Sequence, residues 1–223
     1  MNVAILIYEG FTALDAIGPY EVLRLLPGAE IQFVATTAGP KRTDQGSLAV
    51  VADYDTSSLK TADILVVPGG PGQEVAGEDA ALLDWVRAVH AKTSWTTSVC
   101  TGSLILGAAG ILRGLRATSH WMFLDRLRQF GAEPTLERVV EQGKVITAAG
   151  VSSGIDMGLR LASRIAGDDV AQAIQLGIEY DPQPPFDAGS PRKAPSHVVD
   201  IVRQAMERAR VGSGPRRSVS LTQ

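Results

Sequence analysis

Cysteine and histidine are scarce in this chain. A single cysteine in 223 residues, Cys100, excludes an intramolecular disulfide framework and suits a reducing compartment, so we expect a cytoplasmic protein. The three histidines, His90, His120 and His197, are far apart in the sequence, and no second cysteine accompanies them. Because no metal-ligand spacing is present, we expect no metal site.

The chain also lacks an excess of charge of one sign and a long apolar run. Its 21 basic and 24 acidic residues give a net charge of −3, which leaves no basic footprint for nucleic acid. No apolar run is long enough to cross a bilayer. Residues 1–8 are apolar, but they are too few for a signal peptide and lack a basic leader, so they predict a first strand. We therefore expect neither nucleic acid nor a membrane as a partner.

What the chain does contain is an alternation of apolar strands and amphipathic helices. Strands are predicted at 3–8, 31–36, 64–68 and 95–99, with a hairpin or edge strand at 46–54 and a pair of strands at 138–140 and 144–147. Helices are predicted at 20–26, 79–92, 101–109, 122–130 and 196–210, among others. This alternation indicates an α/β fold with a mostly parallel sheet. We expect one domain over residues 1–210 and a flexible C-terminal tail at 211–223.

The turn at Cys100 is the most informative part of the sequence. It joins the predicted strand at 95–99 to a helix rich in Leu and Ala, the arrangement of a nucleophile elbow. The N–H groups that open such a helix favour a thiolate and can hold a developing negative charge. A lone cysteine is commonly a small buried core residue. Its place between a strand and a helix favours the nucleophile instead.

Two further turns follow predicted strands. Asp15 lies just after the first strand, and Gly69 and Gly70 follow the strand at 64–68. Because the carboxyl ends of parallel strands lie at one edge of a sheet, these turns and Cys100 can converge. Both features also have a purely structural explanation. Asp15 could be a helix N-cap, and the glycines could form a turn that binds no ligand. His120 could be a base, but a histidine beside a tryptophan is more often a packed residue.

Several motifs resemble the ThiJ/PfpI family, whose fold is flavodoxin-like and doubly wound, with helices on both faces of the sheet. The resemblance covers residues 2–210, and its motifs are Leu14-Asp15-x-x-Gly18-Pro19, Val67-Pro68-Gly69-Gly70 and Ser98-Val99-Cys100-Thr101-Gly102. Within the family, the chain is most similar to the isocyanide hydratases. That likeness extends to Arg116-Ala117-Thr118, to His120-Trp121, and to Pro184-Pro185-Phe186-x-Ala188-Gly189-Ser190-Pro191.

The resemblance implies a cofactor-independent hydratase that adds water to an isocyanide and releases an N-substituted formamide. The catalytic residues carried over are Cys100 as nucleophile, Asp15 as proton shuttle and Thr101. Thr101 would orient Asp15 through its hydroxyl and face developing charge with its N–H, and the Gly70 N–H is a weaker candidate for that charge. The resemblance also implies a homodimer.

Two other functions remain open from the sequence. Related regulators join this kind of domain to a helix-turn-helix module, so a non-catalytic ligand or redox sensor is one alternative. A glyoxalase-like enzyme acting on small aldehydes is the other. Many such relatives carry a histidine beside the cysteine or a glutamate near the position of Asp15, whereas this chain has Thr101 and Asp15. That difference favours the hydratase.

Overall fold

A computed structural model describes the backbone of residues 1–212 and the side chains of residues 1–208. The chain forms two compact units, Met1–Tyr180 and Asp181–Gln223. The first contains the α/β fold. The described part of the second contains a loop and the helix α7, Ser196–Gly212. The single domain expected over residues 1–210 stays a prediction, and most of the expected tail lies outside the described residues.

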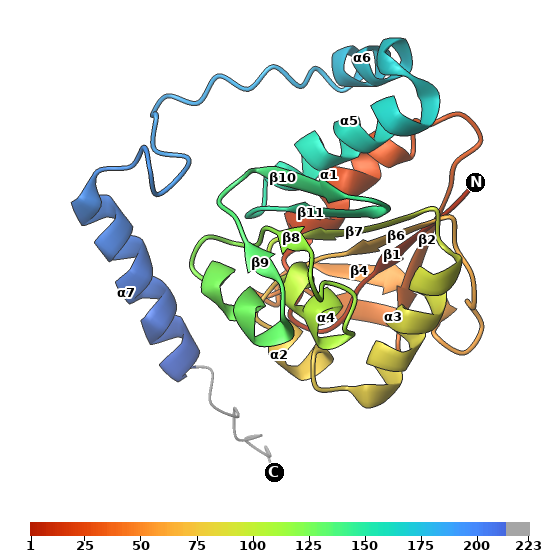
Figure 1. Cartoon of the computed structure of the whole chain (residues 1–223), viewed down its shortest axis with the longest axis horizontal. Helices are drawn as coiled ribbons and strands as arrows, with labels where there is room; N and C mark the ends of the chain where they lie inside the picture. Colours follow the sequence, from red (N-terminus) through yellow and green to blue (C-terminus); the bar gives the residue numbers. More distant parts are fainter. Residues whose placement is uncertain (213–223) are drawn as a thin grey trace, which may run out of the picture. The chain divides into compact units, whose positions relative to one another are not determined.

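A seven-stranded sheet forms the centre of the first unit (Figure 1). Its order is β10-β11-β7-β6-β1-β2-β5. The strands are β1 Asn2–Leu6, β2 Glu30–Ala35, β5 Tyr54–Asp55, β6 Ile64–Val67, β7 Trp95–Val99, β10 Val139–Gln142 and β11 Val145–Ala148. All neighbours pair in parallel except β10 and β11, which form an antiparallel hairpin at one edge. This confirms the mostly parallel, doubly wound sheet.

Helices cover both faces of this sheet (Figure 1). On one side lie α1 Ala13–Leu23, α5 Ser153–Ala166 and α6 Asp168–Gly177; on the other lie α2 Gln73–Ala76, α3 Ala80–Lys92 and α4 Gly102–Ala108. The central strands are therefore buried on both faces, which is why β6 is apolar throughout and all four of its residues are buried. None of the helices in the described part of the chain is long and apolar enough to span a membrane.

Among the described residues, four short strands and a 3₁₀ helix lie outside the central sheet. A hairpin of β3 Gly39–Arg42 and β4 Ala49–Ala52 and a short pair of β8 Arg116–Ala117 with β9 Glu133–Pro134 lie outside it. The helix predicted at 122–130 is a 3₁₀ helix, η1 Leu124–Phe130.

The first helix departs from the prediction. A helix is predicted at 20–26, yet α1 begins at Ala13 and passes through Pro19, a residue type that usually interrupts a helix. The reason is tertiary, since α1 packs along α5 and burial of that face outweighs the local propensity. The earlier start places Asp15 in the first turn of α1.

Candidate active site

Cys100 occupies a strained turn between β7 and α4. Its φ of 57° lies in the left-handed region, which costs a non-glycine residue free energy unless its surroundings hold it there. The Cys100 N–H donates to the carbonyls of Ala148 and Ala149, at 3.0 Å each, at the end of β11. The hydroxyls of Ser103 and Ser119 donate to the Cys100 carbonyl at 3.1 Å each. The backbone on both sides of the thiol is thus fixed by four partners.

Two glycines allow the β6–α2 loop to lie against this turn. A Cβ on Gly69 would lie 2.4 Å from the Thr101 nitrogen, and one on Gly102 would lie 2.0 Å from the Val67 carbonyl oxygen. Neither position accepts a side chain, so the two backbones touch directly. The glycines therefore have a close-packing role, and they bring the loop N–H groups of β6–α2 beside Cys100.

Asp15 meets the same loop from α1. Its side chain is fully buried, and Oδ2 accepts a hydrogen bond from the Gly69 N–H at 2.9 Å. Oδ1 is buried and accepts no hydrogen bond of ordinary geometry from the described residues. The N-cap of α1 is Thr12, so the alternative that Asp15 caps the helix is wrong. The carboxylate instead lies close enough to the Cys100 thiol for each group to shift the pKa of the other.

Burial sets the protonation of Asp15. Loss of solvent, with a smaller contribution from the nearby charge of Asp44, raises the pKa of its carboxyl, and the net change is from 3.8 to about 7. Hydrogen bonds from the Gly69 N–H and from Cys100 act in the opposite direction. A carboxyl with a pKa near 7 can both accept and donate a proton at neutral pH, which is the property of a general acid–base group.

The cysteine differs from the sequence-based expectation of a favoured thiolate. Burial raises the pKa of the Cys100 thiol well above its usual range, and the charge of Asp15 raises it further. The Thr101 N–H, the Val151 N–H and the Thr101 hydroxyl oppose this rise without cancelling it. The helix dipole contributes little because α4 has only seven residues. The resting group is therefore a thiol that needs a base, and Asp15 lies beside it.

Thr101 and Gly70 are joined to each other. The sequence suggests that the Thr101 hydroxyl orients Asp15 and that the Gly70 N–H faces the substrate. In the structure the Gly70 N–H donates to Thr101 Oγ1 at 2.9 Å, while the N–H that holds Asp15 belongs to Gly69. Both expected contacts are replaced because the close backbone approach at Gly69 places Thr101 Oγ1 against this loop. The Thr101 N–H remains directed at Cys100.

The sequence reasoning missed Val151. This residue has a φ of 22°, and its N–H hydrogen-bonds to the sulfur of Cys100. It follows β11 at the same sheet edge as the other three turns, which is the signal that would have found it. With the Thr101 N–H, it forms a pair of backbone donors around the thiol.

His120 packs near the site and is not joined to the thiol. Its ring lies 5.8 Å from Trp121 and 5.9 Å from Phe123, and the Met122 N–H approaches its Nδ1 at 3.4 Å. Burial lowers the pKa of its imidazole. Among the described residues, no hydrogen bond joins His120 to Cys100 or Asp15, so the packed interpretation holds.

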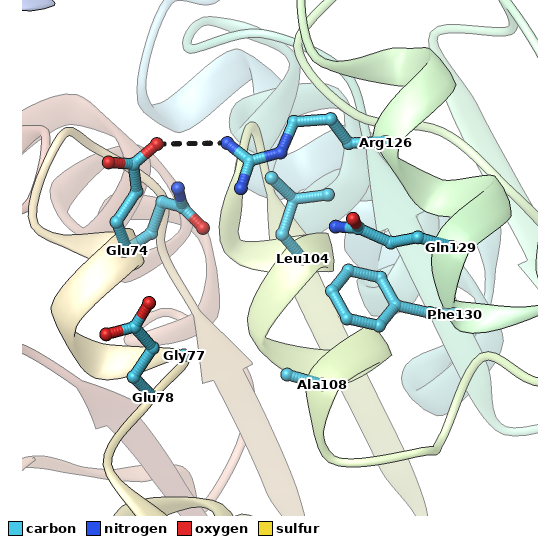
Figure 2. Close-up of a pocket in the computed structure, with 9 residues that line it drawn as sticks. Glu74, Gly77, Glu78, Leu104, Ala108, Arg126, Gln129 and Phe130 are labelled. Carbon is cyan, nitrogen blue, oxygen red and sulfur yellow. Dashed lines mark hydrogen bonds and ion pairs between the residues drawn. The ribbon is translucent and has the colours of Figure 1, made fainter.

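A cavity of about 570 Å³ lies between α2, α4 and η1 (Figure 2). Arg126 pairs with Glu74 across it at 3.1 Å, and Leu104 and Phe130 supply apolar walls. Neither Cys100 nor Asp15 lines it. The cavity is therefore separate from the reactive pair, although α4, which supplies one of its walls, begins two residues after Cys100.

Comparisons with known proteins identify the family of this chain. The chain is 42% identical over 204 residues to an isonitrile hydratase of Pseudomonas putida, covering 92% of this chain and 89% of that protein. A crystal structure of a ThiJ/PfpI family protein from Pseudomonas syringae matches with a TM-score of 0.88 and 42% identity, covering 92% of this chain and 86% of that one. The HTH-type transcriptional regulator CdhR of Pseudomonas aeruginosa is 28% identical over 78% of this chain and only 53% of its own length. The model of the DJ-1/PfpI family matches residues 1–164, and the chain belongs to that family.

Proposed function

We propose that this protein is an isonitrile hydratase, which converts an isocyanide and water to an N-substituted formamide. The observation that carries the proposal is the buried pair of Cys100 and Asp15, in which the carboxyl has a pKa near 7. The similarity to the Pseudomonas putida isonitrile hydratase supports it, since it covers nearly the whole of both chains.

Cys100 is proposed as the nucleophile, and the turn that carries it as a nucleophile elbow. Asp15 takes the proton of the thiol as the sulfur bonds to the terminal carbon of R–N≡C. Asp15 then gives this proton to the same carbon, which leaves a covalent thioimidate, R–N=CH–S–Cys. The Thr101 and Val151 N–H groups lie at the sulfur and stabilise negative charge that develops there.

Asp15 serves again in the second half of the reaction. It removes a proton from water as the oxygen adds to the thioimidate carbon, and the proton passes to nitrogen. The C–S bond then breaks, the thiol regains a proton, and R–NH–CHO leaves. The sum is one isocyanide and one water to one formamide, so no metal or organic cofactor enters the proposed reaction.

Glyoxalase and peptidase activity fit the site less well. Peptide hydrolysis needs an acid that protonates an amine leaving group, and a histidine supplies it in papain-like enzymes. His120 makes no hydrogen bond to Cys100 within the described residues. Isocyanide hydration has no leaving group other than the thiol, so Asp15 alone suffices.

The test is a product assay by mass spectrometry. Purified protein is incubated with a small panel of alkyl and aryl isocyanides and, separately, with methylglyoxal. We expect formamide from the isocyanides and little lactate from methylglyoxal. Lactate without any formamide would establish the aldehyde reaction instead, and ligand binding without turnover would favour the sensor.

We also propose a cellular compartment and an oligomeric state for the protein. The single cysteine and its role as a thiol suit the reducing cytoplasm, and the family resemblance favours a homodimer. Exposed apolar residues such as Leu48 and Val51 on the β3–β4 hairpin offer contact area for a second copy.

A further inference from the structure

One peptide group links a buried tyrosine to the proposed acid–base residue. The hydroxyl of Tyr8, just beyond β1, donates to the Pro68 carbonyl oxygen at 2.8 Å. The N–H of the same peptide unit belongs to Gly69 and donates to Asp15 Oδ2 at 2.9 Å. Both hydrogen bonds are buried. Tyr8 and Asp15 thus hold the opposite ends of a single planar amide.

We propose that Tyr8 is a positioning residue that sets the orientation and the proton affinity of Asp15 through the Pro68–Gly69 peptide. A peptide unit is rigid, so a hydroxyl that fixes its carbonyl also fixes the direction of its N–H. A hydrogen bond accepted at the oxygen polarises the amide and makes its N–H a stronger donor. The stronger donor favours the ionised form of Asp15 and lowers its pKa.

Tyr8 acts as a neutral donor in this arrangement. Burial raises the pKa of its phenol well above the usual value, and the charges of Asp15 and Cys100 raise it further. The phenol therefore keeps its proton throughout the range in which Asp15 titrates. The hydroxyl is separated from the Asp15 carboxylate by a single peptide unit, Pro68–Gly69.

Charged and titratable groups reach Asp15 from three elements. Cys100 influences the pKa of Asp15 from the β7–α4 turn, Tyr8 lies near it at the end of β1, and Asp44 acts on it from the β3–β4 hairpin. Asp44 is held there by the Thr12 hydroxyl, which donates to Asp44 Oδ2 at 3.1 Å. Asp44 raises the pKa of Asp15, whereas the amide held by Tyr8 lowers it. The two residues provide perturbations of opposite sign.

The test follows the Asp15 carboxyl directly by ¹³C NMR titration of protein labelled at the aspartate carboxyl carbon. The Asp15→Asn protein identifies its resonance. We expect Tyr8→Phe to raise the pKa of Asp15 by a few tenths of a unit, the size that follows if polarisation contributes about 10–30% of a charge-assisted bond. Asp44→Asn is expected to lower it. An unchanged or lowered pKa in Tyr8→Phe would overturn the proposal.

Tyr20→Phe is the matched control. Tyr20 packs its ring on Phe33 at 5.7 Å and its hydroxyl makes no hydrogen bond with the described residues, so its removal should leave the Asp15 titration unchanged. If Tyr8→Phe does not fold, fluorinated tyrosine is incorporated instead. Its more acidic hydroxyl is a stronger donor, and the pKa of Asp15 should then fall. A rise or no shift on fluorination would contradict the proposal.

The catalytic consequence rests on the proposed hydratase function, but the titration does not. With isocyanide as substrate, Tyr8→Phe should move the acid limb of the kcat/KM profile upward by the same few tenths of a unit. If the wild-type protein turns over no isocyanide, the proposed function fails while the NMR titration still decides the role of Tyr8. If Tyr8→Phe shifts the acid limb of the kcat/KM profile but leaves the pKa measured from the Asp15 carboxyl resonance unchanged, Tyr8 does not act through the Pro68–Gly69 peptide.

Discussion

Replacing Asp15 by Asn is expected to stabilise the protein above neutral pH while removing its activity. The Asp15 carboxyl has its pKa raised from 3.8 to about 7, so roughly three pKa units separate the unfolded and folded states. At about 1.36 kcal/mol per unit, keeping this buried group ionised costs about 4 kcal/mol of folding free energy. Asn keeps an oxygen for the Gly69 N–H and carries no charge.

The sign follows from proton binding. Between pH 3.8 and about 7 the folded protein binds a proton at Asp15 that the unfolded chain has released, so wild-type stability falls as pH rises through this window. The Asn protein has no carboxyl at this position, so its stability does not fall in this window. The difference in stability between the Asn protein and the wild type should be small near pH 4, grow with pH, and level off above pH 7.

Urea denaturation of both proteins from about pH 4.5 to about pH 8 measures the difference between their free energies of unfolding. The range lies below the titration of the Cys100 thiol, whose pKa is raised. At about pH 8 the Asn protein should melt on the order of 10 °C higher. A stability difference that stays constant across the pH range would refute the argument that Asp15 titrates near neutrality.

Asp55→Asn is a control of opposite sign. The hydroxyl and N–H groups of Ser57 and Ser58 lower the pKa of the partly exposed Asp55 carboxyl to about 2. Its ionised form is therefore favoured by folding, so the stability deficit of the Asn protein should develop between about pH 2 and pH 3.8 and stay constant from about pH 4.5 to about pH 8.

Three further predictions concern the turn and the assembly. Cys100→Ala and Cys100→Ser should fold and lose turnover; near-wild-type formamide production by either protein would rule out the covalent route. Gly102→Ala should lower the melting temperature sharply, because its Cβ would lie 2.0 Å from the Val67 carbonyl oxygen, whereas Gly177→Ala has no atom within 4 Å and should melt like the wild type. Light scattering at micromolar concentration should give a dimer mass, and a monomer mass would contradict the proposed assembly.

The strands and the edge of the sheet that carries the site could be predicted from the sequence. Runs such as Ile64–Val67 are apolar at every position because both faces are covered, and that pattern is local. The parallel arrangement then brings the turns after β1, β6 and β7 to one edge, which is why Asp15, Gly70 and Cys100 could be predicted to converge. Residue type and topology were sufficient for these predictions.

The protonation states and hydrogen-bond partners were decided only by the tertiary structure. The raised pKa values of Asp15 and Cys100 come from burial and from each other, and these residues lie far apart in the sequence. The partner of the Thr101 hydroxyl and the role of Val151 depend on how closely separate loops approach. Desolvation and hydrogen bonding act through distances in space, so local sequence could name the reactive residues but not the state in which each is held.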